Sequence, residues 1–298
     1  MLKKYLAAGL LLLLSFNAVK AQDPLREKIA QLAKTANGIV GVSVLGLESR
    51  DTLNYNGNAR LVMHSVMKFP IAMTALHLVD SGVLTLNQTI HIKKSDLPET
   101  AVSPLRDKYP NGDADVTISE LLSDMVSYSD NDACDILLKK IGGPQQVMSY
   151  LHSIKIRGIN VATNEAGQNV PGAWEVQYTN WCKPADMIKL LDVFYTGKAL
   201  SAESKAILYK IMTETSTGPH RIKGMLPTGT IVAHKTGSSG TNEAGLSPAT
   251  NDVGIITLPN GRHLAIAIFV CNSTADLATR EGVIAKIAKA VYDANVNK

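Results

Sequence analysis

Residues 253–271 read VGIITLPNGRHLAIAIFVC, in which two apolar, β-branched runs flank the dipeptide Asn260-Gly261. Asn-Gly favours the two-residue turn of a β-hairpin, because both of its residues tolerate positive φ. The pattern therefore predicts two hairpin strands, Val253–Leu258 and His263–Cys271.

Further strand-forming runs lie on both sides of a long helical region. One run is Ile231–Lys235, and another is Ile39–Leu47, followed by a short partner around Leu53 and Tyr55. From about Val66 to Tyr209 the apolar spacing is mostly helical. The predicted central helices are Val66–Ser81, Ser119–Met125, Asp132–Ile141, Gly143–Ser153, Pro184–Tyr195 and Ala202–Met212. Terminal helices are predicted at Asp23–Ala36, with Asp23 as its cap, and at about Ala275–Ala294.

Strands at both ends and helices in the middle predict an α+β fold. We expect one antiparallel sheet flanked by the terminal helices, with the central helices forming an inserted all-helical lobe. Residues 22–298 would form a single domain, with an α/β lobe at about 22–60 and 213–298 and a helical lobe at about 61–212. A ligand site is expected in the cleft between the lobes.

The first 21 residues have the layout of a secretory signal. Lys3 and Lys4 precede an apolar run from Tyr5 to Phe16, and small residues end at Ala21. The run is too short to span a bilayer, which predicts cleavage near Ala21 and a periplasmic or secreted protein without a membrane anchor.

Charge and cysteine content exclude several classes of partner. Removal of a signal with three lysines takes the formal net charge from +4 to +1, which gives no footprint for nucleic acid or an anionic membrane. Cys134, Cys182 and Cys271 show no CxxC spacing and no histidine at ligand spacing. We expect three buried thiols, and a single disulfide between two of them is the alternative. We expect neither a metal nor a cofactor.

Three short motifs indicate chemistry: Ser65-Val66-Met67-Lys68, Ser129-Asp130-Asn131 and Lys235-Thr236-Gly237, in this order. Ser65 precedes a helical run, and Lys68 follows one turn later on the same face. A serine hydroxyl needs a nearby base to act as a nucleophile, and a lysine with a depressed pKa can accept its proton. Taken alone, Ser65 could be a helix cap and Lys68 a solvated cation.

The second motif is expected in a loop between helices, where a capping loop is the alternative interpretation. We expect Ser129 to relay a proton to a leaving nitrogen, Asn131 to contact a substrate amide and Lys68, and Asp130 to hold the loop.

The third motif ends a strand, so a simple turn is the alternative. We expect Gly237 to let a ligand approach the backbone. Lys235, Thr236 and Ser238 would face a substrate carboxylate, and the N–H groups of Ser65 and Ser238 would form an oxyanion hole. The three motifs together, in order, favour catalysis over the separate alternatives.

This motif set resembles that of class A serine β-lactamases, a resemblance that extends over essentially the whole mature length. The stretches Thr217–Arg221, Leu226-Pro227, His234–Gly237 and Tyr178–Trp181 are similar to the PER and VEB extended-spectrum branch. The resemblance implies two lobes, a covalent acyl-enzyme at Ser65, and hydrolysis of the β-lactam ring of penicillins and cephalosporins. It also implies small-molecule β-lactams as partners, and we expect a monomer.

The resemblance places the deacylating glutamate at Glu165 and a second ligand of the hydrolytic water at Asn169. Two departures from the family are visible. Thr163 and Tyr178 stand where many members have an Arg–Asp salt bridge, so we expect the loop to have its own conformation. Val253 replaces an arginine that binds the substrate carboxylate, and Arg221 is the substitute candidate, with a surface arginine as the alternative.

Two other functions remain open. A penicillin-binding D-Ala-D-Ala peptidase and a β-lactam sensor share the three motifs but would acylate without turnover. The division of substrates among penicillins, oxyimino-cephalosporins and carbapenems is left open, although the PER and VEB likeness favours cephalosporins.

Overall fold

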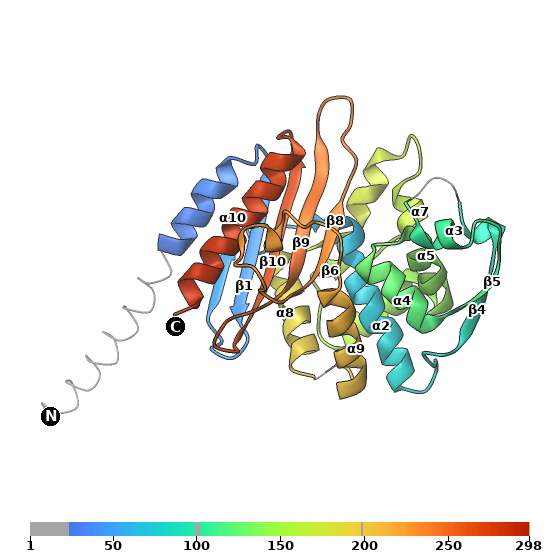
Figure 1. The fold of residues 1–298 in the computed structure, drawn as a ribbon. Coiled ribbons are helices and arrows are strands. Elements are labelled where there is room, and N and C mark those ends of the chain that lie inside the picture. Colours follow the sequence, from blue (N-terminus) through green and yellow to red (C-terminus); the bar gives the residue numbers. More distant parts are fainter. Residues whose placement is uncertain (1–23, 99–101, 198, 298) are drawn as a thin grey trace, which may run out of the picture.

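The structure is a computed structural model that describes residues 24–98, 102–197 and 199–297. Its main sheet has five antiparallel strands in the order β2-β1-β10-β9-β8 (Figure 1). The strands are β1 (Ile39–Gly46), β2 (Thr52–Tyr55), β8 (Val232–Ser238), β9 (Ser247–Thr257) and β10 (His263–Ser273). The hairpin predicted at Asn260-Gly261 is present, but its loop runs from Leu258 to Arg262 and is longer than the predicted two-residue turn. Gly261 has φ +79°, whereas the φ of Asn260 is not positive. The α+β fold class is confirmed.

β9 begins at Ser247, well before the predicted start at Val253. Its first half contains four buried polar residues whose side chains bond to partners outside the strand, namely Ser247, Thr250, Asn251 and Asp252. Asn251 Nδ2 donates to Val62 O (2.9 Å), and Thr250 Oγ1 accepts from Arg280 Nε (2.8 Å). These bonds satisfy buried polar groups that would otherwise oppose burial of the strand.

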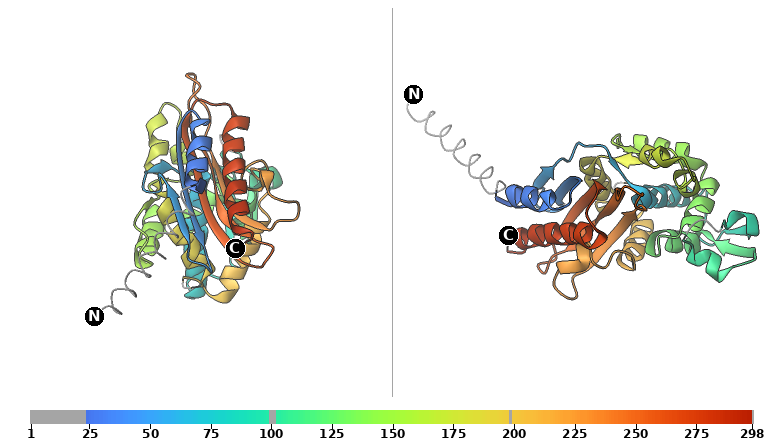
Figure 2. Two further views of the ribbon diagram at one scale, coloured as in Figure 1. Left: turned by 90° about the vertical axis from the view of Figure 1, so that its left-hand side faces the viewer. Right: turned by 90° about the horizontal axis from the view of Figure 1, so that it is seen from above.

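The two terminal helices cover one face of the sheet, as predicted. Residues 24–34 and α10 (Leu277–Asn295) run side by side there (Figures 1 and 2). The apolar layer between these helices and the sheet includes Ile29 and Ile284 of the helices and Val42 and Ile268 of the sheet. The predicted cap Asp23 and the predicted signal lie outside the described residues.

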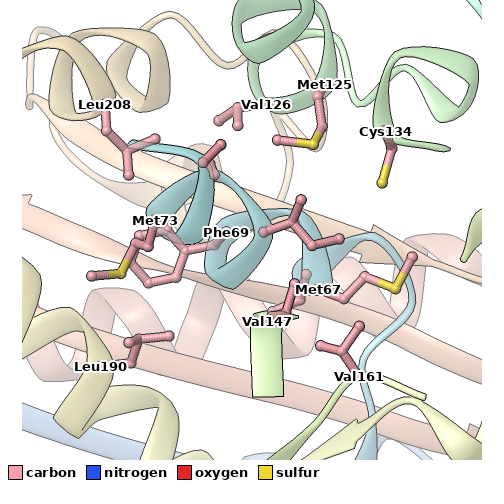
Figure 3. Close-up of a cluster of buried hydrophobic side chains, with 14 of the residues drawn as sticks. Met67, Phe69, Met73, Met125, Val126, Cys134, Val147, Val161, Leu190 and Leu208 are labelled. Atoms are coloured by element: carbon pink, nitrogen blue, oxygen red, sulfur yellow. The ribbon is translucent and has the colours of Figure 1, made fainter. Parts of the chain in front are cut away.

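The opposite face of the sheet packs against helices. α2 (Lys68–Asp80), which is buried from Lys68 to Leu76, runs through the second core, where Phe69 and Met73 meet side chains of the surrounding helices (Figure 3). Those helices are α4 (Ile118–Ser127), α5 (Asn131–Lys140), α6 (Gly143–Ser153), α8 (Pro184–Tyr195) and α9 (Ala202–Thr213). α8 contacts β1 and β10, although it lies within the span predicted as the helical lobe. The lobe boundaries stay a prediction.

A small three-stranded sheet was not predicted, yet it positions the site. β3 (Leu61–Val62) pairs with β7 (Trp181–Cys182), which pairs with β6 (Ile159–Asn160). β3 leads directly to Ser65. β6 immediately precedes and β7 immediately follows residues 161–180, which are here called the Glu165 loop. The sheet therefore joins the start of that loop, its end and the Ser65 segment.

The remaining elements are short or peripheral. They are a hairpin of β4 (Thr89–Lys93) and β5 (Gly112–Thr117), the helices α3 (Pro104–Lys108) and α7 (Glu165–Gln168), and the 3-10 turns η1 (His64–Met67), η2 (Lys94–Asp96), η3 (Trp174–Thr179) and η4 (Ile222–Met225). Cys134, Cys182 and Cys271 are buried free thiols. Within the described ranges, no helix is long and apolar enough to cross a bilayer.

Candidate active site

Ser65 lies at the start of a helix, as predicted, in the 3-10 turn η1 that continues into α2. The preceding residue, His64, has φ +46°, a left-handed conformation that non-glycine residues rarely adopt. Strained backbone of this kind is enriched at functional sites. The turn is held from behind by Met63 N, which donates to Asn180 O (2.9 Å).

Lys68 is fully buried and surrounded by oxygen atoms. Its Nζ donates to Ser129 O (2.7 Å) and to Asn131 Oδ1 (2.6 Å), and it lies 3.0 Å from Glu165 Oε1. Ser65 Oγ donates to the same Glu165 oxygen (3.0 Å). A hydroxyl, an ammonium and a carboxylate therefore meet at one atom, where Lys68 and Glu165 are buried and Ser65 is half-buried.

The pKa of Glu165 is held below its usual value in this setting. Burial alone opposes ionisation, but the charge and hydrogen bond of Lys68 outweigh it, with further help from His64 and from a hydrogen bond with Gln168. The carboxylate is thus ionised at neutral pH and able to accept a proton.

The Ser129 loop joins α4 to α5, and Asp130 holds it as predicted. The buried Asp130 carboxylate accepts from Ala133 N (2.8 Å), Leu105 N (2.6 Å) and Ser103 Oγ (2.9 Å). Ser129 itself has φ +60°, and its Oγ accepts from Lys235 Nζ (2.8 Å). The Ser129 hydroxyl consequently sits between two lysines, with Lys68 Nζ at 3.5 Å.

β8 brings Lys235, Thr236 and Ser238 to the site. Burial, followed by the nearby charge of Lys68, lowers the pKa of Lys235 well below its usual range. Thr236 Oγ1 lies 2.6 Å from Thr217 Oγ1, and Ser238 is exposed at the end of the strand.

Gly237 serves a purpose that the sequence did not reveal. A Cβ atom at this position would lie 2.3 Å from Met63 O and 3.1 Å from Val66 N. The missing side chain therefore lets β8 pack directly against the turn that contains Ser65. The expectation that Gly237 also lets a ligand approach the backbone stays a prediction.

Asp135 fixes the backbone of Glu165 and was missed by the sequence reasoning. Its carboxylate accepts from Glu165 N (2.7 Å), Ala166 N (2.9 Å) and Asn164 Nδ2 (2.8 Å). Asp135 follows Asn131 by four residues on α5, so both lie on one face of that helix. That spacing from the second motif was the available signal.

Comparison with known proteins agrees with this geometry. The profile of the Beta-lactamase enzyme family matches residues 24–295. The chain belongs to this family. The VEB-1 β-lactamase of Pseudomonas aeruginosa is 43% identical over 278 residues, which cover 93% of this chain and 92% of the relative. The extended-spectrum β-lactamase PER-1 of the same organism is 39% identical over 300 residues, covering 100% and 96%.

Solved structures give the same result. A β-lactamase from Chitinophaga pinensis has a TM-score of 0.88 and 47% identity, covering 91% of this chain and 99% of its own. The TLA-1 extended-spectrum β-lactamase has a TM-score of 0.90 and 43% identity, covering 93% and 99%. The protein is a class A β-lactamase, a hydrolase of cyclic amides.

In this β-lactamase an amide closes the neck of the Glu165 loop. The buried Asn180 accepts at Oδ1 from Ala162 N (2.7 Å) and Thr163 N (3.1 Å), and its Nδ2 donates to Thr163 O (3.0 Å). Tyr178 points elsewhere and donates to Asn272 Oδ1 (2.7 Å). These hydrogen bonds hold the ends of the loop, because Thr163 and Tyr178 cannot form the Arg–Asp salt bridge of many other members.

Gln168 contacts the carboxylate of Glu165, and the sequence reasoning did not select it. Its buried Nε2 donates to Glu165 Oε2. Asn169, the candidate water ligand, is exposed, and its Nδ2 donates to the backbone O of Glu165 (2.7 Å). Its role toward water stays a prediction.

Arg221 is not a surface arginine. It is 4% exposed, pairs with Glu281 through Nε (3.0 Å), and donates through NH1 to Gly237 O (3.1 Å) and Asn251 O (2.9 Å). Its NH2 donates to Ser238 Oγ (2.7 Å), which places its charge at the exposed end of β8. Over the described ranges, no group of three His, Cys, Asp or Glu residues is placed to hold a metal ion.

Proposed function

We propose that this β-lactamase hydrolyses penicillins and cephalosporins, including oxyimino-cephalosporins, through a covalent ester of Ser65. The observation that supports this most directly is that Ser65 Oγ and Lys68 Nζ both meet Glu165 Oε1. The extended-spectrum name of the PER-1 relative supports the wider cephalosporin range.

In acylation, Ser65 Oγ attacks the lactam carbonyl carbon while its proton passes to Glu165 Oε1, the atom to which the hydroxyl already donates. The sequence-based prediction that Lys68 is this base is the alternative assignment. In the present scheme Lys68 Nζ, which donates to Ser129 O and Asn131 Oδ1, passes a proton on from Glu165 to Ser129. Ser129 Oγ accepts from Lys235, so its own proton is free to be donated to the ring nitrogen as the C–N bond breaks. The N–H groups of Ser65 and Ser238 stabilise the oxyanion.

In deacylation, the regenerated Glu165 carboxylate takes a proton from a water molecule, which attacks the ester carbonyl. Gln168 and Asp135 orient Glu165 for this step, and Asn169 is a candidate second ligand of the water. The ester C–O bond then breaks, and Ser65 recovers its proton.

Substrate binding is assigned to the polar groups around Ser65. Lys235, Thr236, Ser238 and Arg221 face the substrate carboxylate, with Arg221 acting beside Ser238. Asn131, which accepts from Lys68, binds the side-chain amide of the substrate. No metal or cofactor takes part in this scheme.

The test uses two variants with a chromogenic cephalosporin. We expect Ser65→Ala to abolish turnover and Glu165→Ala to accumulate a covalent adduct visible by mass spectrometry. Full activity of either variant would contradict the mechanism. Stoichiometric labelling of the unmodified enzyme without turnover would favour a D-Ala-D-Ala peptidase or a sensor instead.

Export and a monomeric state are part of the same proposal. Residues 1–21 act as the signal peptide, and the mature enzyme is periplasmic or secreted. The intact mass of protein recovered from the periplasm should correspond to a chain that begins at Gln22, and its mass in solution should be that of one chain.

A further inference from the structure

A side-chain contact between His64 and Gln177 also joins the Ser65 turn to the later part of the Glu165 loop. His64 Nε2 lies 2.9 Å from Gln177 Oε1, and each of the two residues is 4% exposed. His64 directly precedes Ser65, and Gln177 lies in η3, close to the end of the loop. The contact therefore links two segments that must keep their relative position during the reaction.

The bonding partners determine which atom donates. Gln177 Nε2 donates to Trp174 O (2.8 Å), so Gln177 Oε1 is turned toward His64 as an acceptor. His64 Nε2 must then hold the proton and donate it. Burial, and then the positive charge of Lys68, lower the pKa of His64, against the opposing effects of Gln177 and Glu165. The imidazole is thus neutral at pH 7 and makes one directional, buried hydrogen bond.

The left-handed backbone of His64 limits where this donor can point. At φ +46° few residue types are tolerated, with Asn, Asp and His enriched among them. The position of the imidazole follows the geometry of the turn, and the loop is held to it through Gln177.

The importance of this contact changes during the reaction cycle. In the free enzyme Ser65 Oγ donates to Glu165 and helps to hold it. Once Ser65 Oγ becomes an ester oxygen it has no proton to donate, so that bond is lost. The acyl-enzyme then depends more on the remaining contacts of the loop.

We propose that His64, acting through Gln177, is a positioning residue for deacylation. This inference rests on the proposed function. The hydrogen bond from His64 to Gln177 holds the Glu165 loop at the correct place relative to the Ser65 ester after the direct bond between Ser65 and Glu165 has been lost.

The test compares Gln177→Met, which removes the acceptor without altering the Ser65 turn, with His64→Asn, which tolerates the left-handed backbone but is too short to reach. We expect each to lower kcat by roughly 10-fold, the effect of one buried hydrogen bond, with kcat/KM changed less than about twofold. The acyl-enzyme should accumulate in the steady state, as measured by mass spectrometry.

Two further variants complete the design. The double variant should be no slower than either single one, since both remove the same bond. Val170→Ala, on the exposed part of the same loop, is the matched control and should behave as the unmodified enzyme. An unchanged kcat, an additive double variant, or an equal fall in kcat and kcat/KM would overturn the proposal.

A measurement on the free protein separates this inference from the proposed function. Absence of β-lactam turnover by the unmodified enzyme would contradict the proposed function alone. Amide hydrogen exchange of residues 174–179 needs no turnover and should become faster in Gln177→Met and in His64→Asn. Unchanged exchange in both would overturn the contact between His64 and Gln177 as a restraint on the loop.

Discussion

Two regions of different construction meet at Glu165 Oε1. The motif region, consisting of the Ser65 turn, the Ser129 loop and the end of β8, places two fully buried lysines around a hydroxyl. The Glu165 loop is held by neutral amides and by one carboxylate, Asp135, which bind mainly its backbone. In the first region the residues that are proposed to react also build the site. In the second, the proposed base Glu165 is positioned by residues to which the proposed mechanism assigns no contact with the substrate.

The difference has an energetic side. A buried charge that loses its partner is strongly destabilised, whereas a lost neutral hydrogen bond costs less. Damage to the motif region should therefore remove the chemistry, while damage to the loop should slow it. The following predictions test that contrast.

The largest effect is expected for Lys68→Met. It leaves the Glu165 carboxylate buried without its cation, so the pKa of Glu165 should rise from its present position below the usual value. We expect kcat/KM for a cephalosporin to fall by at least about 1000-fold, with the acid limb of the pH–rate profile moved to higher pH. Lys289→Met, which breaks an exposed ion pair with Asp293, is the control and should change neither. An unshifted acid limb would contradict the pairing of Lys68 with Glu165.

A smaller effect is expected for Asn180→Leu in the loop neck. The change leaves Ala162 N and Thr163 N without their acceptor. We expect a loss of roughly 2–3 kcal/mol in the free energy of unfolding and a fall in kcat on the order of 50-fold. Urea denaturation and steady-state kinetics measure the two quantities. A fall in kcat as large as that of Lys68→Met would erase the contrast between the regions.

Gly237→Ala tests the contact between β8 and the Ser65 turn. The added Cβ would stand 2.3 Å from Met63 O, so the strand must move away from the turn. We expect a cost of about 1–3 kcal/mol and a fall in kcat/KM of about 10-fold for penicillins and cephalosporins alike. At Gly240 a Cβ would meet no heavy atom within 4 Å, so Gly240→Ala is the matched control. Equal effects of the two changes would disprove the steric explanation.

The smallest effect concerns Asp124, on α4 behind the Ser129 loop. Burial, and then repulsion from Asp130 and Glu120, raise the pKa of Asp124 to about 6. The folded state therefore binds this proton more tightly than the unfolded state, and the associated stability is present at low pH and lost as pH rises through 6. Relative to the unmodified enzyme, Asp124→Asn should gain up to about 1 kcal/mol between pH 5 and pH 7.5, because partial exposure screens the effect. Urea denaturation at both pH values measures it, and a gain equal at the two would exclude the titration of Asp124 as its cause.

The sequence was sufficient to predict the elements that have a local sequence pattern. Apolar periodicity predicts α8 at Pro184–Tyr195, the same bounds as in the structure, and Asn260-Gly261 predicts the hairpin. The first half of β9 has no such signal, because buried polar residues such as Asn251 are satisfied only by distant partners. The two-residue strands of the small sheet are too short to show a pattern.

The same distinction applies to the site. Short motifs contain Ser65, Lys68, Ser129 and Lys235. In the structure these residues are connected by a chain of contacts that runs through Glu165. Asp135, Gln168 and Asn180 act through bonds to a loop whose path is not encoded in any one of them. Sequence patterns therefore indicated the groups that are proposed to react, and only the folded chain revealed what positions them.

The strand order also determines when the chain can fold. β10, the last strand of this sheet in chain order, lies in the middle of the sheet between β1 and β9. Until residues 263–273 have left the ribosome, β1 lacks its inner neighbour and the apolar layers on both faces of the sheet are incomplete. Closing contacts between residues this far apart is slow, because a long loop must be ordered before the pairing stabilises it. A nascent chain that stops short of β10 is thus left with an unpaired strand edge, and the sheet can close only after residues 263–273 are available.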